Sequence, residues 1–157
     1  MDDNAHLLGN DKLVSGGQTG VDRGALDAAM ALGIQHGGWC PRGRLAEDGR
    51  IPTRYRLTDT ESSEYWVRTE QNVIDSDGTL LLYRGRLSGG TEFTYRMTRK
   101  HRKPSLQVDL LTSPHPEPVR QWIAEHGIGV LNVAGPRESS CQGIAKQARQ
   151  FIESVVA

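Results

Sequence analysis

Hydroxyl, amide and arginine side chains gather around paired glycines at three places in this sequence. The first is Ser15-Gly16-Gly17-Gln18-Thr19-Gly20, followed closely by Asp22 and Arg23. The adjacent glycines let the backbone approach a ligand or adopt a positive φ. A helix starting here would offer free N–H groups and a positive dipole end to an anion. The hydroxyl and amide side chains add donors, and Arg23 could fork onto a phosphate. The run therefore predicts an anion-binding loop.

This first loop matches neither of the two common phosphate-binding signatures. A P-loop ends in Gly-Lys-Ser/Thr, whereas Gly20 is followed by Val21 and Asp22. The glycine spacing of dinucleotide-binding loops is also absent. The alternative is a tight glycine turn that only packs a helix against a strand.

Two further loops repeat the pattern. Ser88-Gly89-Gly90-Thr91 again places a small hydroxyl residue and two glycines before a helix, and Asn132 to Arg137 includes Gly135. Asn132 and Arg137 are candidate polar contacts, while Ser139 or Ser140 could simply cap the last helix. Loops from one sheet could converge on a diphosphate or similar polyanion, but only if the strand order brings them together.

A tryptophan and a cysteine precede the longest irregular stretch. Trp39 could stack on a base or pterin ring and Arg42 could pair with phosphate, although Trp39 could equally belong to the core. Cys40 as a nucleophile would need a base and a lowered pKa, and the sequence identifies no such partner.

Three carboxylates are candidates for acid–base chemistry: Asp22, Asp77 and Glu92. Each is expected near a strand end, where burial can tune a carboxyl pKa for general acid or base work. The alternatives are structural, because Asp77-Gly78 can form a turn and Asp22 can favour a helix N-terminus.

A basic run supplies a third, different hypothesis. The cations that could contact single-stranded nucleic acid are Arg96, Arg99, Lys100, Arg102 and Lys103. Only Tyr95 lies among them as a stacking platform, so a solvated helix face is the favoured interpretation.

The elements that must position these residues alternate along the chain. Apolar runs and period-two patterns predict strands at 12–15, within 34–40, and at 79–83, 104–110 and 128–133. Helical periodicity and capping residues predict helices at 21–32, from 59–62 to about 74, and at 91–100, 116–126 and 144–155. Residues 41–59 carry no apolar period and are expected to form a long loop. The alternation predicts a doubly wound Rossmann-like α/β fold: about five parallel strands with helices on both faces.

Composition bounds the remaining possibilities. The 157 residues fit one domain, with residues 1–10 expected to be loosely ordered. The 19 basic and 19 acidic residues balance, which argues against duplex DNA binding. There is no long apolar run for a membrane span, and the two cysteines and five histidines show no metal-ligand spacing. We expect a cytoplasmic protein with no metal site, and a homo-oligomer.

Together these motifs resemble the bacterial "putative molybdenum carrier" family. The similarity runs in order from about residue 12 to the end of the chain. Beyond the first loop, it is carried by Gly37-Gly38-Trp39-Cys40-Pro41, Ala46-Glu47-Asp48-Gly49, Ile51-Pro52, Arg68-Thr69-Glu70-Gln71-Asn72, Asp75-Ser76-Asp77-Gly78-Thr79, Leu87-Ser88-Gly89-Gly90-Thr91 and Leu131 to Ser139.

The resemblance implies a Rossmann-like fold related to LOG-type (lysine-decarboxylase-like) nucleotide hydrolases and to DNA-processing protein A. It also implies a ligand bound in the glycine loops, a nucleotide or the molybdenum cofactor. LOG-type hydrolases carry P-G-G-x-G-T-x-x-E, from which Ser88-Gly89-Gly90-Thr91-Glu92 departs. We therefore expect a binding protein for an anionic, phosphate-bearing small molecule. A LOG-like nucleotide hydrolase is the alternative, and single-stranded nucleic-acid binding comes after it.

Overall fold

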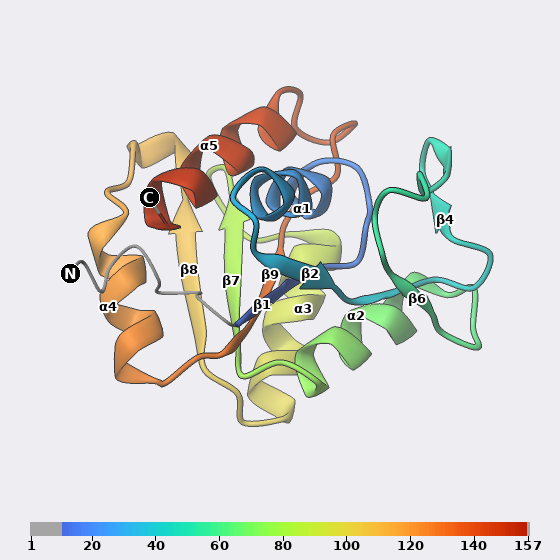
Figure 1. The fold of residues 1–157 in the computed structure, drawn as a ribbon, viewed down its shortest axis with the longest axis horizontal. Coiled ribbons are helices and arrows are strands. Elements are labelled where there is room, and N and C mark those ends of the chain that lie inside the picture. The colour runs from blue at the N-terminus through green and yellow to red at the C-terminus, as the bar shows by residue number, and fades with distance from the viewer. Residues whose placement is uncertain (1–10, 157) are drawn as a thin grey trace.

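The computed structural model describes residues 11–156, so the expectation for residues 1–10 lies outside the described residues. At its centre is a five-stranded, fully parallel sheet with the order β2-β1-β9-β7-β8 (Figure 1). Its strands are β1 (Lys12–Val14), β2 (Gln35–Gly37), β7 (Gly78–Tyr83), β8 (Ser105–Asp109) and β9 (Val130–Ala134).

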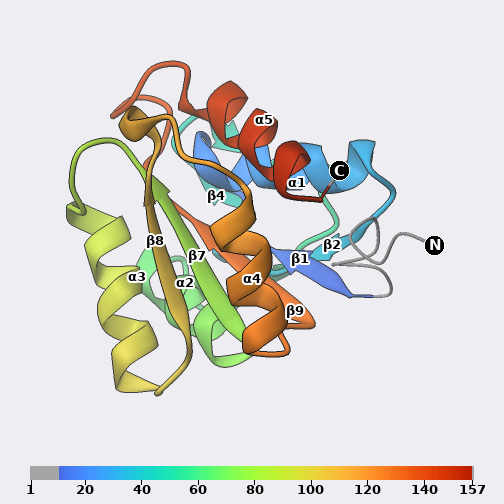
Figure 2. The ribbon, with the colours of Figure 1, turned by 90° about the vertical axis from the view of Figure 1, so that its left-hand side faces the viewer.

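Helices cover both faces of this sheet. They are α1 (Val21–Ala31), α2 (Tyr65–Ile74), α3 (Gly89–Lys100), α4 (Glu117–Glu125) and α5 (Ile144–Val156), with a short 3-10 helix at Leu110–Thr112. Helices α1, α4 and α5 lie on one face, and α2 and α3 lie on the other (Figures 1 and 2). The predicted doubly wound fold is confirmed.

Burial explains the two-sided arrangement. The side chains of Leu80, Leu81 and Leu82 in β7 point alternately to the two faces, and all three are inaccessible to solvent. Helices α1 and α5 approach closely because α1 carries small residues on its packed side. A Cβ on Gly24 would lie 2.2 Å from the carbonyl oxygen of Ala145 in α5, so only glycine fits there.

Residues 39–59 contain short strands, which corrects the expectation of a long irregular loop. Strand β3 (Trp39–Cys40) pairs in parallel with β6 (Thr58–Asp59), and β4 (Leu45–Ala46) pairs antiparallel with β5 (Gly49–Arg50). Buried Ile51 and Tyr55 anchor the segment to the core. The guanidinium of Arg44 donates to the carbonyl oxygens of Ile51, Pro52 and Tyr55 and so ties its turns together. Helix α2 begins at Tyr65 and not at 59–62 as predicted, because Thr58 and Asp59 belong to strand β6.

The strand order places the three glycine loops next to one another. Strands β1, β9 and β7 are neighbours, so the loops that follow them leave the same carboxyl edge side by side. The chain passes from β1 through α1 to one side of the sheet and from β7 through α3 to the other. In open α/β sheets, ligands bind in the crevice at such a switch point.

Candidate functional site

A cavity of about 560 Å³ lies at this carboxyl edge, between the three loops and α2. It brings together ten of the predicted site residues: Gly16, Gln18, Asp22, Ser88, Gly89, Gly90, Thr91, Asn132, Gly135 and Arg137. The convergence that the sequence left open is therefore present in the structure.

The N-terminus of α3 forms one wall of the cavity. The hydrogen bonds to the Ser88 carbonyl come from the amides of Thr91 and Glu92. Within residues 11–156, the amides of Gly89 and Gly90 have no acceptor. A Cβ on either glycine would meet no atom within 4 Å, and both residues line the cavity. Helix α3 thus presents two unpaired donors and its positive dipole end to the cavity.

Arg68 of α2 forms the facing wall, and its side chain is only 9% exposed. Its Nε donates to the Tyr65 carbonyl (3.2 Å) and to the Thr69 hydroxyl (3.1 Å), which fixes the guanidinium. Its Nη1 lies 3.6 Å from Oδ2 of Asp22, while Nη2 has no hydrogen-bond acceptor among the described residues. A Cβ on Gly16 would lie 1.8 Å from Nη1, so the first loop needs glycine there to make room for this arginine.

Asp22 is the buried carboxylate of the cavity. Its Oδ2 accepts a hydrogen bond from the Gln18 amide at 3.2 Å. Burial raises the pKa of Asp22 to about 6, even though the nearby Arg68 guanidinium and the loop amides favour the charged form. The carboxyl group therefore titrates close to neutral pH, within reach of a ligand in the cavity.

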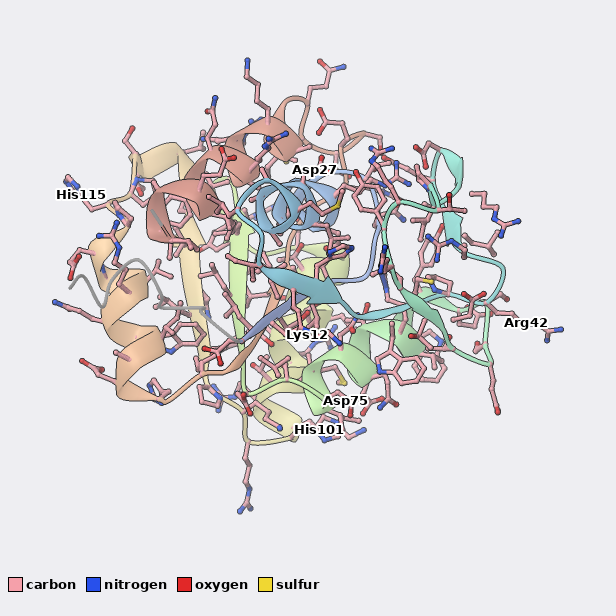
Figure 3. The ribbon with its side chains drawn as sticks, viewed as in Figure 1. Lys12, Asp27, Arg42, Asp75, His101 and His115 are labelled. Carbon is pink, nitrogen blue, oxygen red and sulfur yellow. The ribbon has the colours of Figure 1, made fainter. Side chains whose placement is uncertain are left out.

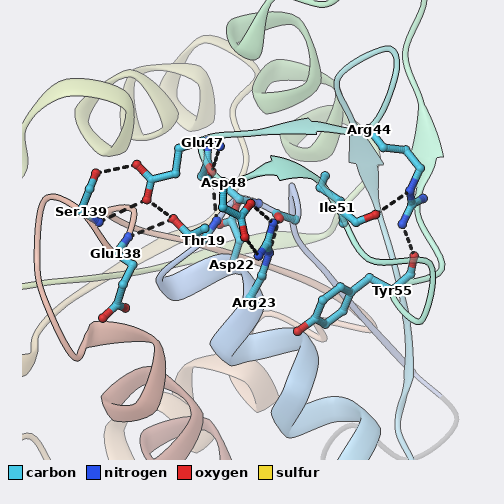
Figure 4. Close-up of polar contacts among 12 residues, drawn as sticks. Thr19, Asp22, Arg23, Arg44, Glu47, Asp48, Ile51, Tyr55, Glu138 and Ser139 are labelled. Atoms are coloured by element: carbon cyan, nitrogen blue, oxygen red, sulfur yellow. Dashed lines mark hydrogen bonds and ion pairs between the residues drawn. The ribbon is translucent and has the colours of Figure 1, made fainter.

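Other donors of the first loop are used within the protein (Figure 4), and their residues do not line the cavity. Arg23 donates to the Gly17 carbonyl and forks onto Asp48 at 2.6 and 2.7 Å. The Thr19 hydroxyl donates to Glu47. The Ser15 hydroxyl donates to the Asp22 carbonyl, and Gly20 packs against the Pro136 carbonyl. These predicted contacts build and brace the loop behind the cavity wall.

Two other predicted site residues, Trp39 and Arg42, do not line the cavity. The indole N–H of Trp39 donates to Asp75 at 2.7 Å, and its backbone amide donates to Asn72. Arg42 is exposed and extends into solvent (Figure 3). Burial raises the pKa of the neighbouring Cys40 thiol to about 11, with Asp59 adding to the effect, so the thiol stays protonated at neutral pH.

The other two candidate carboxylates are also placed outside the cavity. Asp77 lies at the amino end of β7, the opposite edge of the sheet, where it accepts from the amides of Gly129 and Val130. Glu92 is exposed on α3 and does not line the cavity. Of the three, only Asp22 meets a potential ligand there.

The basic run at the end of α3 makes mostly internal contacts. Lys100 pairs with Glu70 at 3.0 Å, Lys103 donates to the Ser76 carbonyl, and Arg99 contacts the Tyr95 hydroxyl. These contacts favour the structural interpretation of the run.

Sequence reasoning did not select α2 as part of the site. Helix α2 contributes Tyr65, Trp66, Arg68, Thr69 and Asn72 to the cavity lining. One signal was available, because Arg68 is the only basic residue between 57 and 77, a segment with six acidic residues. A lone arginine in an acidic segment is a candidate for a specific contact.

Comparison with known proteins agrees with this architecture. Residues 13–156 match the model of the circularly permutated YpsA SLOG family. The chain belongs to this family. A solved structure of a "putative molybdenum carrier protein" from Syntrophus aciditrophicus SB is 43% identical, with a TM-score of 0.91, covering 94% of this chain and 95% of that one.

A second solved structure is far less similar to this SLOG-family chain. It is (E)-4-hydroxy-3-methyl-but-2-enyl diphosphate reductase, at 12% identity and a TM-score of 0.39, covering 96% of this chain and 62% of that one. This value is too low to carry an argument. No protein of curated function matches the chain.

None of the helices within residues 11–156 is both long and apolar enough to span a membrane. Within the same residues, histidine, cysteine, aspartate and glutamate form no group of three that could hold a metal ion.

Proposed function

We propose that this SLOG-family protein binds a phosphate-bearing heterocyclic small molecule, a nucleotide or a pterin, in the cavity at the carboxyl edge of the sheet. The phosphate would lie between the N-terminus of α3 and Arg68. The ring would lie toward Tyr65 and Trp66 on α2.

One observation carries this proposal. A nine-tenths buried arginine with an unpaired Nη2 lines the same cavity as the unpaired amides of Gly89 and Gly90. Burying an arginine is costly unless its charge is compensated, and Asp22 at 3.6 Å compensates it only in part. A phosphate would accept from both walls and supply the remaining negative charge.

Size and shape agree with such a ligand. A volume of about 560 Å³ falls in the range usual for small-molecule sites, roughly 300–1,000 Å³. The side chain of Trp66 lines this cavity although the residue is 55% exposed, so its ring is available for stacking. An exposed aromatic beside a phosphate site is a natural partner for a base or pterin ring.

The Syntrophus neighbour is named as a molybdenum carrier, and the molybdenum cofactor has both required parts, a pterin ring and a phosphate. The residues present fit these two parts, since Arg68 and the α3 amides suit the phosphate and the α2 aromatics suit the ring.

Isothermal titration of the full chain with AMP, GMP and a phosphorylated pterin tests the proposal. Arg68→Met removes the charge and Gly90→Val places a side chain over the α3 amides. We expect each variant to weaken the best ligand by at least about tenfold. The matched control is Arg149→Met, which removes an exposed arginine paired with Glu153 away from the cavity. Unchanged affinity in both cavity variants would refute the placement of the phosphate.

A nucleotide hydrolase is the second candidate, favoured by one feature. Asp22, with its pKa near 6, could take up or release a proton beside a bound phosphate ester. Incubating the protein with nucleoside monophosphates and separating the products by liquid chromatography tests this. Turnover that Asp22→Asn abolishes would support hydrolysis, and no turnover of any nucleotide would exclude it for these substrates.

We also propose a cytoplasmic location and a homo-oligomeric state. Cell fractionation tests the location, and light scattering after size-exclusion chromatography measures the oligomeric state.

A further inference from the structure

The β4–β5 hairpin, residues 45–50, is fastened to the carboxyl edge of the sheet by the carboxylate of Glu47 (Figure 4). Oε2 of Glu47 accepts from the Thr19 hydroxyl and from the Ser139 amide at 3.2 Å. Oε1 accepts from the Ser139 hydroxyl at 2.5 Å and lies 3.7 Å from Nε of Arg137. Three hydrogen-bond donors and one arginine therefore converge on one carboxylate.

This set of donors is one that a phosphate oxygen would also accept from. A backbone amide, two hydroxyls and an arginine are the usual partners of phosphates and carboxylates alike. Hydrogen bonds from Ser139 and Thr19 lower the pKa of Glu47, so its carboxylate is charged at neutral pH. The Glu47 side chain thus occupies an oxyanion-binding site.

The oxyanion site adjoins the large cavity. Arg137 lines the cavity and also reaches Glu47, with about half of its side chain exposed. Ser140, the residue after Ser139, lines the cavity as well. Gln18 links the two from the other side, because its Oε1 accepts from the Glu47 amide at 2.8 Å while the residue lines the cavity. A ligand extending from the cavity past Arg137 would meet this site next.

We propose that Thr19, Arg137 and Ser139 form a second anion subsite, which takes the distal phosphate of a diphosphate ligand and which Glu47 fills in the free protein. Binding of the distal phosphate replaces the Glu47 carboxylate and releases the hairpin. The inference rests on the proposed function, since it extends the same ligand site by one phosphate.

The residue next to Glu47 provides a matched control. Asp48 fastens the same hairpin through its fork with Arg23, but Arg23 does not line the cavity. Asp48→Asn therefore weakens the attachment of the hairpin without vacating the subsite. Glu47→Gln, by contrast, keeps the shape of the side chain and removes the charge that competes with a phosphate for Arg137.

Titrating the full chain and both variants with ADP and AMP tests the inference. We expect Glu47→Gln to bind ADP about three- to tenfold more tightly than wild type and AMP within about twofold of it. Asp48→Asn should stay within about twofold of wild type for both nucleotides. Equal tightening for ADP and AMP would reveal a general charge effect, and weaker ADP binding would make Glu47 part of the site. Either result overturns the inference.

Hydrogen exchange of the hairpin amides supplies a second, independent readout. Saturating ADP should speed the exchange of residues 45–50 in the wild-type chain, whereas saturating AMP should not. Slower or unchanged exchange with bound ADP would mean that Glu47 keeps its place, and the inference fails while the proposed function stands. Binding of neither nucleotide to any of the three proteins would overturn both for these ligands.

Discussion

Replacing Asp22 by asparagine should flatten the pH dependence of stability between about pH 5 and pH 7. Asp22 is a carboxyl group whose pKa rises from 3.8 to about 6 on folding, mainly because it is buried. The folded state therefore binds a proton that the unfolded chain has already released. The stabilisation that this bound proton gives is complete below the pKa of Asp22 in the unfolded chain, and it is lost as the pH rises through the pKa of Asp22 in the folded chain.

The size of the effect follows from the two pKa values of Asp22. With values of 3.8 and about 6, protonation of this carboxyl group stabilises the fold by roughly 1 kcal/mol at pH 5, relative to the charged form, and by almost nothing at pH 7. The wild-type chain should thus lose roughly 1 kcal/mol of unfolding free energy across this interval that the Asp22→Asn variant keeps. All other titrating groups are shared, so the difference between the two proteins isolates this carboxyl group.

Urea denaturation of both proteins, followed by circular dichroism at pH 5 and pH 7, measures how much the unfolding free energy of each protein changes between the two pH values. The side-chain amide that Asp22→Asn introduces would still present an oxygen to the Gln18 N–H, so the loop retains its hydrogen bond. Parallel pH dependences for wild type and variant would refute the reasoning. Such a result would mean that solvent in the cavity, or Arg68, keeps the pKa of Asp22 near its ordinary value.

The remaining predictions concern the glycines and the hairpin. Gly16→Ala should displace Arg68, because its Cβ would lie 1.8 Å from Nη1, and weaken phosphate binding at least about tenfold in titration calorimetry. Gly24→Val should cost at least about 2 kcal/mol in urea denaturation, since its Cβ would lie 2.2 Å from the backbone of α5; wild-type stability would contradict this packing. Hydrogen bonds from Ser139 lower the pKa of Glu47, and those from Arg23 lower the pKa of Asp48. The stabilisation that these two carboxylates give to the hairpin is therefore present at neutral pH and is lost as the pH falls below the ordinary pKa range of Asp and Glu. Hairpin amides should therefore exchange faster at about pH 3 than at pH 5, after correction for the intrinsic rates; equal protection would contradict the role of these carboxylates.

The alternation of elements could be predicted from the sequence because each has a strong local signal. The apolar run Thr79 to Tyr83 indicates a buried strand, and the small residues of 21–32 repeat at helical spacing. The strand order could not be predicted, since the placement of β9 between β1 and β7 depends on long-range pairing. The two-residue strands between 39 and 59 were missed because so short a strand shows no period.

The candidate site was predictable to a similar degree. The glycine loops indicated the edge of the sheet at which the cavity lies, because each of them follows a strand and so leaves the carboxyl edge. Arg68 was not selected, since its entry into the cavity depends on how α2 packs beside the first loop. Asp77 was selected as a carboxylate near a strand end, but it precedes its strand, and in a parallel sheet that position lies at the amino edge, away from the loops that follow the strands.

The first glycine loop, which by its sequence was the leading phosphate cradle, has a different role in the folded chain. Three of its donors are matched by acidic side chains: the Gln18 amide donates to Asp22, the Thr19 hydroxyl to Glu47 and the Arg23 guanidinium to Asp48. An anion entering there would have to displace a carboxylate, whereas at the N-terminus of α3 it would meet unpaired amides. The loop instead makes room for Arg68, and the phosphate site that we propose lies between the second loop and α2. Beside the cavity, Arg23 pairs with Asp48 and Arg137 approaches Glu47, whereas Arg68 is compensated only in part by Asp22, which suits a ligand that brings its own negative charge.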